Sequence, residues 1–167
     1  MPRLYRAFGA AFGLLMSVLA TGQLYAADEP KPFIVYDAGL QNGWINWSWA
    51  TVQIAFPAGN AKPIRAEAEP WAAVALHHDP FSTKDFKKLT FVINGGVDGG
   101  QELAIKLVVD GKAVDSNYII HPKAKTWARA EIPLKDIGGV GQAIDGVWIQ
   151  AQGTACKPFY VTRIQFE

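Results

Sequence analysis

The segment QELAIKLVVDG (residues 101–111) decides the fold class of this chain. Gln101, Leu103, Ile105, Leu107 and Val109 alternate with residues that include a glutamate and a lysine. Successive side chains of a β-strand point to opposite faces, so this alternation predicts a strand with its first set of residues facing a core. The Asp-Gly pair that follows is a strong hairpin signal. The segment therefore predicts an antiparallel sheet with one covered face.

The same pattern of short apolar segments between Gly, Pro, Asn and Asp recurs along the chain. Strands are predicted at 33–37, 44–56, 71–78, 89–93, 101–109, 116–121, 126–134, 146–152 and 158–166, and short helical turns only at 82–88 and 134–137. In 71–78 the core set is Ala72, Val74 and Leu76, and in 146–152 it is Val147, Ile149 and Ala151. Many short strands with such turns predict an all-β domain, a β-sandwich or jelly roll.

The N-terminal region has the layout of a secretory signal peptide. Arg3 and Arg6 precede an uncharged apolar stretch over 7–20, which is short for a membrane span, and small residues follow up to Ala27. We expect a signal peptide at 1–26, an extended leader at 27–32 and the β-domain at 33–167, with cleavage after Ala26 or Ala27. The protein is then secreted or periplasmic, with no membrane span after signal removal. An uncleaved N-terminal anchor is the alternative.

Charge and cysteine content limit the classes of function that fit this chain. The chain has 16 basic and 15 acidic residues, and removal of the signal peptide would leave it close to neutral. Its lysines are scattered, so no nucleic-acid partner is expected. Cys156 is the single cysteine, which rules out an internal disulfide, and its GTACKP context holds no histidine for a thiol nucleophile.

Six tryptophans, at 44, 47, 49, 71, 127 and 148, are the most prominent candidates for ligand binding. Sugars present flat C–H faces, and aromatic rings offer large contact area at low conformational cost. Trp148, Gln150 and Gln152 are predicted to point outward. For Trp47, Trp49 and Trp127, packing in the core is the preferred interpretation. The predicted stacking residues are Trp44, Trp71 and Trp148, and the predicted hydrogen-bonding residues are Asn46, Gln101 and Gln150.

Catalysis and metal binding find little support in the sequence. His77 and His78 are adjacent, so on a strand they point to opposite faces and cannot easily share one ion. No GxSxG nucleophile motif is present, and acidic residues suggest a carboxylate pair only by composition. The Gly95–Gly100 run follows a strand but opens no helix, which favours a tight inter-strand connection over a phosphate loop. The sequence therefore predicts no enzyme, no metal site and no cofactor.

The segment YDAGLQNGWINWSWATV (36–52) resembles bacterial secreted carbohydrate-binding modules with a galactose-binding-like jelly roll. Further matching features are Trp71 with Val74 and Leu76, FVINGG at 91–96, GGQ at 99–101, TW at 126–127, IPL at 132–134, Gln150 and FYV at 159–161. The resemblance covers nearly all of 33–167. It implies a non-catalytic module whose partner is a polysaccharide or glycan.

Two positions depart from the pattern of these modules. Ala38 and the pair Thr162-Arg163 stand where the modules tend to carry acids that hold a structural calcium. Asp37 alone would leave such a site short of oxygen ligands, so bound calcium is doubtful.

Two alternatives to saccharide binding stay open. The first is a structural or protein-interaction module of the cell envelope or extracellular matrix, and the second, less favoured, is an enzyme acting on polysaccharide.

Overall fold

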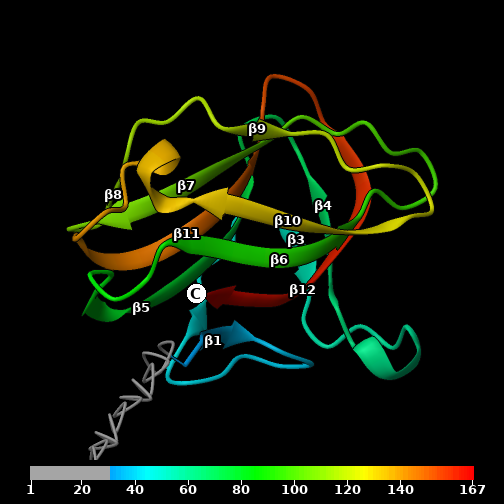
Figure 1. Cartoon of the computed structure of the whole chain (residues 1–167). Helices are drawn as coiled ribbons and strands as arrows, with labels where there is room; N and C mark the ends of the chain where they lie inside the picture. The colour runs from blue at the N-terminus through cyan, green and yellow to red at the C-terminus, as the bar shows by residue number, and fades with distance from the viewer. Residues whose placement is uncertain (1–30) are drawn as a thin grey trace, which may run out of the picture.

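The computed structural model describes residues 31–167, which form two antiparallel sheets packed face to face (Figure 1). Sheet A has the order β10(Trp127–Pro133), β6(Lys88–Asn94), β12(Cys156–Phe166), β4(Ile64–Ala68) and β3(Thr51–Gln53), with β1(Phe33–Tyr36) also paired to β12. Sheet B has the order β2(Ile45–Asn46), β5(Ala73–Ser82), β11(Ala143–Ala151), β7(Leu103–Val109) and β8(Lys112–Ala113), with β9(Ile119–Ile120) also paired to β7. The predicted all-β sandwich is confirmed.

The core lies between the sheets and follows the predicted alternation. Leu103, Ile105 and Leu107 of β7 are fully buried. The predicted core sets of β5 and β11 are also buried. Phe91, Phe159 and other large apolar side chains of sheet A fill the opposite half. Because the strands alternate, each sheet keeps a second, outer face that turns away from this core.

Several strand boundaries differ from the prediction. The segment 44–56 is not one strand, because β2 belongs to sheet B and β3 to sheet A. β4 was not predicted, since its sequence IRAEA has few large apolar residues. β5 continues through Asp79-Pro80 to Ser82, and 83–87 connects it to β6 through a turn rather than a helix. The predicted helical turn at Leu134–Ile137 is present as the 3₁₀ helix η2, and a second one, η1, covers Gly59–Ala61.

The predicted signal peptide and most of the leader lie outside the described residues. Over 31–167, there is no helix with the length and apolar character required to cross a membrane.

An ion-pair cluster closes one end of sheet A around the carboxylate of Glu167. Arg129 Nη2 donates to Glu167 Oε1 at 2.7 Å, and Lys88 Nζ lies 3.2 Å from Oε2. Burial alone would raise the pKa of Glu167. Hydrogen bonds from Gln165, Arg129, Lys88 and Thr90 outweigh that effect and bring the pKa down to about 2.

This lowered pKa predicts a contribution to acid stability. A carboxyl whose pKa is lower in the folded than in the unfolded state stabilises the fold above the unfolded value, here the ordinary 4.5. That contribution is lost as the pH falls from 4.5 toward 2. We expect the urea midpoint of Glu167→Gln to vary less with pH in this window than that of the wild type. Equal pH dependence of the two midpoints would contradict the assignment.

Candidate functional site

The outer face of sheet B is built on three rows of residues that pair across β5, β11 and β7. Trp148 lies at the centre of the middle row, between Ala75 and Lys106. The row on one side has Gln150 between Ala73 and Ala104, and the row on the other side has Gly146 between His77 and Val108. Most of these residues have small side chains, so the surface around Trp148 is low and the indole rises above it.

Trp47 and Trp49 flank this floor along the edge of β5. The chain after β2 stays extended there, because Trp47 N donates to Ala75 O at 2.9 Å and Trp49 N to Ala73 O at 3.2 Å. Being two residues apart on an extended chain, the two indoles point to the same side. Trp47 is 60% exposed and stacks on His77, with ring centroids 3.6 Å apart and planes at 7°. Trp49 is 48% exposed.

The carbonyl of Trp71 connects the tryptophans of this face. It accepts hydrogen bonds from Trp49 Nε1 at 3.0 Å and from Gln150 Nε2 at 2.9 Å. Trp49 also meets Trp148 edge to face, with centroids 4.8 Å apart at 86°. These contacts fix the side chains of Trp49, Gln150 and Trp148 relative to one another and to the main chain of Trp71. We call Trp47, Trp49, Trp71 and Trp148 the tryptophan face.

Trp71 itself has an unusual backbone conformation. It occupies φ = 69°, and Ala72 N donates to Glu69 O at 2.9 Å, closing a turn with Pro70 at its second position. A turn of this kind normally carries Gly or Asn where Trp71 stands, because side chains with a Cβ are strained at positive φ. The indole is nevertheless 57% exposed, so its packing against the rest of the domain does not compensate for the backbone strain. Strained backbone conformations of this kind cluster at functional sites.

A cavity of about 90 Å³ opens between Trp47, Trp49 and Trp148, with Gly146 on its floor. A Cβ on Gly146 would lie 2.9 Å from Val108 Cγ2, so only glycine leaves this space open. Asp145 lines the cavity and is nearly buried. Its Oδ2 accepts a hydrogen bond from Gly111 N at 2.8 Å, which fixes the β7–β8 turn. The outer face is thus both aromatic and hollowed.

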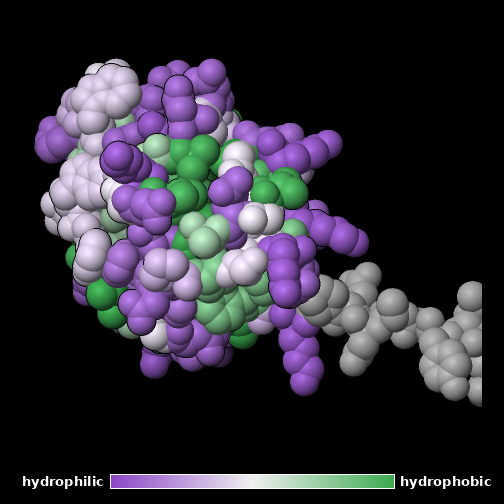
Figure 2. All heavy atoms as spheres, turned by 90° about the vertical axis from the view of Figure 1, so that its left-hand side faces the viewer, coloured by the Kyte–Doolittle hydropathy of each residue, from purple (hydrophilic) through white to green (hydrophobic). Residues whose placement is uncertain are grey.

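The structure brings together three of the predicted site residues and adds two more. Trp148 and Gln150 lie on the outer face of sheet B, as the alternation of β11 indicated. Exposed Trp71 lies beside them, where its main-chain carbonyl accepts hydrogen bonds from Gln150 and Trp49. Trp47 and Trp49, which we had expected in the core, are exposed beside them. Trp127 is also exposed, but on sheet A. Figure 2 shows pale side chains, the colour of near-neutral residues such as tryptophan, gathered along the left edge of the molecule.

Trp44, Gln101 and Asn46 do not belong to this face. Trp44 is 3% exposed and packs in the core, so it offers no ring to a ligand and its predicted stacking role is wrong. Gln101 is 7% exposed, and its Nε2 donates to Gly95 O at 2.9 Å, where it holds a loop. Asn46 is exposed at the sheet edge, but it pairs with the inward-facing Leu76, and its Oδ1 accepts a hydrogen bond from Ser48 N.

Two features of the described residues bear on metal and thiol chemistry. No group of three or more His, Cys, Asp or Glu within 31–167 is placed to hold a metal ion. Burial and the nearby Glu102 carboxylate raise the pKa of the Cys156 thiol, which disfavours the reactive thiolate. The chemistry that the face can provide is contact with apolar ligand surface and hydrogen bonding by amide and lysine groups.

The two-sheet antiparallel sandwich is similar to solved structures of carbohydrate-binding modules. A mutant of a family 29 carbohydrate-binding module superposes with a TM-score of 0.62 at 15% identity, over 83% of this chain and 92% of the module. Two further mutants are similar. One, complexed with mannohexaose, gives 0.61 at 14% identity over 81% and 90%. The other, complexed with cellulohexaose, gives 0.59 at 16% over 81% and 89%. This chain therefore has the fold of family 29 modules.

The sequence comparison finds similarity to part of a longer protein. The chain is 28% identical over 142 residues to an endoglucanase of Dictyostelium discoideum, an alignment that covers 78% of this chain. It spans only 20% of the length of that endoglucanase. No protein-family model matches the chain.

Proposed function

We propose that this protein binds polysaccharide without catalysis, through the tryptophan face of sheet B. The observation that carries the proposal is the exposure of Trp47 and Trp49 beside Trp148 on one side of the sheet, with exposed Trp71 hydrogen-bonded to this group through its carbonyl. Exposed aromatic rings are otherwise costly in water, and they suit the apolar faces of sugar rings. Gln150 and Lys106 supply hydrogen-bonding groups beside Trp148.

The ligands named for the structural relatives suggest the saccharide class. We infer that a gluco- or manno-oligosaccharide chain lies along the face and contacts several indoles in succession, because the rings come from adjacent segments rather than from one closed pocket. We further propose that the protein is exported, as the N-terminal sequence predicts, and that it acts together with an enzyme that degrades polysaccharide. The similarity to part of an endoglucanase supports that association.

Two measurements test the function. Isothermal titration calorimetry of the full chain with cellulohexaose and mannohexaose should give binding, and a glycan array should place the tightest ligands among such chains. A structural module of the envelope or matrix would instead bind no glycan and would co-purify with a protein. That result would refute the proposal.

Trp71 offers a prediction in which stability and binding move in opposite directions. Trp71→Gly removes the strain of a side chain at φ = 69° and should stabilise the fold by about 1 kcal/mol. The main-chain carbonyl that accepts the two hydrogen bonds stays in place. We expect affinity for cellulohexaose or mannohexaose to fall by about tenfold, since the ring is lost.

Trp71→Ala is the matched control, because it removes the ring but keeps a Cβ at positive φ. It should lose the same affinity without the gain in thermal stability. Calorimetric unfolding and titration of the two variants separate the effects. If Trp71→Gly bound as tightly as the wild type, the ring would not belong to the binding face.

A further inference from the structure

The outer face of sheet A carries a second row of aromatic and amide side chains. The row crosses five strands in register and consists of Trp127 on β10, Asn94 on β6, Tyr160 on β12, Arg65 on β4 and Gln53 on β3. Residues paired in this way point to the same side of a sheet. The proposed function makes no use of these residues.

Three rings of this face form a trough. Tyr160 lies between Phe56 and Trp127, with ring centroids 5.6 Å from the first and 6.4 Å from the second. The planes are tilted by 49° and 56°, so the outer rings rise on either side of Tyr160. A cavity of about 280 Å³ lies among them, a volume close to that of small-molecule sites. Trp127 is 44% exposed.

The wall of the trough is held by main-chain contacts. Asn94 Oδ1 accepts a hydrogen bond from Gly96 N at 2.8 Å, and Lys125 N donates to Gly96 O at 2.7 Å. A Cβ on Gly96 would lie 2.0 Å from Pro158 O, so glycine is required where the loop meets β12. The trough is therefore preformed, which lowers the entropic cost of binding.

The charge that the row itself carries is paired. Arg65 is the one charged member of the row, and its guanidinium pairs with the Glu67 carboxylate beside it. The same guanidinium lies 6.0 Å from the centroid of Phe56. What remains for a ligand is ring surface, the Asn94 amide and the Lys125 side chain, which lines the cavity. This is the same combination as on the tryptophan face, and it fits the C–H faces and hydroxyls of a sugar.

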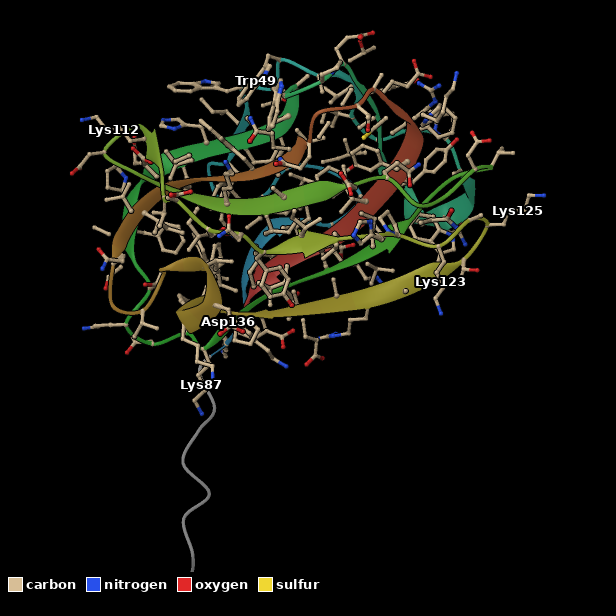
Figure 3. All side chains as sticks on the ribbon, turned by 90° about the horizontal axis from the view of Figure 1, so that it is seen from above. Trp49, Lys87, Lys112, Lys123, Lys125 and Asp136 are labelled. Carbon is tan, nitrogen blue, oxygen red and sulfur yellow. The ribbon has the colours of Figure 1, made fainter. Side chains whose placement is uncertain are left out.

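We propose that the Trp127–Tyr160–Phe56 trough is a second saccharide-binding site, which makes the domain bivalent. The sheets of a sandwich pack about 10 Å apart, so the two sites face away from each other and cannot share one short oligosaccharide. Figure 3 shows Trp49 of the tryptophan face at one side of the molecule, and Lys125, which lines the trough, at another. A bivalent domain would bridge two polysaccharide chains and gain avidity on a dense matrix.

Calorimetric stoichiometry with cellulohexaose and mannohexaose tests this site. We expect the full wild-type chain to bind two oligosaccharides. Trp49→Ala should remove the site on sheet B and leave one. Adding Trp127→Ala should then reduce the remaining affinity by about tenfold or more. Because Trp127 is exposed, that substitution is not expected to unfold the domain. Val140→Ala, at another exposed apolar residue, is the control.

The effect of each substitution on the number of bound oligosaccharides distinguishes this inference from the proposed function. A stoichiometry of one that Trp49→Ala eliminates would overturn the second site and leave the tryptophan face intact. A stoichiometry of one that only Trp127→Ala eliminates would overturn the tryptophan face and retain the trough. Absence of binding in the wild type would overturn both. A shift in oligomeric state caused by Trp127→Ala, without any effect on saccharide, would identify the trough as a protein interface and overturn it as well.

Discussion

Trp49→Ala is expected to reduce saccharide affinity at the tryptophan face by about a hundredfold, which corresponds to about 3 kcal/mol. Trp49 has an exposed ring, and it also holds two neighbours in place. Its Nε1 donates to Trp71 O, and its ring contacts the edge of Trp148 at 4.8 Å. Alanine at this position removes the contact surface of one ring and frees two others. The loss should therefore exceed that of Trp71→Gly.

Trp49→Phe separates the two contributions. It keeps an aromatic surface and part of the contact with Trp148 but cannot donate to Trp71 O. We expect an affinity between those of the wild type and Trp49→Ala. Titration calorimetry gives the affinities, and thermal unfolding should show small changes, since the ring is half exposed. Equal affinity of Trp49→Ala and wild type, with folding intact, would contradict the position of the site on sheet B.

The strand alternation of β7, β5 and β11 was predictable because each strand has one face that is clearly more apolar. In β7, the side that faces the core is identified by Leu103, Ile105 and Leu107. The break between β2 and β3 was not predictable, because the segment from Trp44 to Phe56 is rich in aromatic and β-branched residues and contains no Gly or Pro to mark the break. The change of sheet depends on hydrogen bonds from this segment to Ala73 and Ala75, which local sequence does not encode.

The candidate site was predictable only where polar neighbours marked the outer face. Trp148 alternates with Val147 and Ile149 and is followed by glutamines, so its direction could be inferred. Trp44 and Trp47 lie on opposite faces of an extended segment, and both faces carry large apolar side chains. Alternation then predicts two sets but not which set is buried. Our interpretation assigned them the wrong way round, with Trp44 outside and Trp47 inside.

Trp44 is the position where a core role and a binding role predict opposite results. Its ring packs against Phe33, His78, Phe81 and Phe166, with centroids between 5.1 and 6.4 Å away. Trp44→Ala should reduce the free energy of unfolding by about 3–5 kcal/mol, through lost contacts and the cavity left behind. That is a large part of the stability of a typical domain. Saccharide affinity, measured on the folded fraction, should stay at the wild-type value.

Trp44→Phe is the matched control, and the hydrogen bonding of the indole explains why it should be mild. The buried Nε1 of Trp44 makes no hydrogen bond with any of the described residues. Phenylalanine fills less of the core than tryptophan, which lowers stability. It also removes a buried N–H group without a hydrogen-bond partner, which raises stability, so the two effects oppose each other. We expect a loss of about 1–2 kcal/mol, well below that of Trp44→Ala. Urea unfolding of both variants measures the difference. Retained stability in Trp44→Ala together with weaker binding would contradict the buried position, and would return Trp44 to the ligand face.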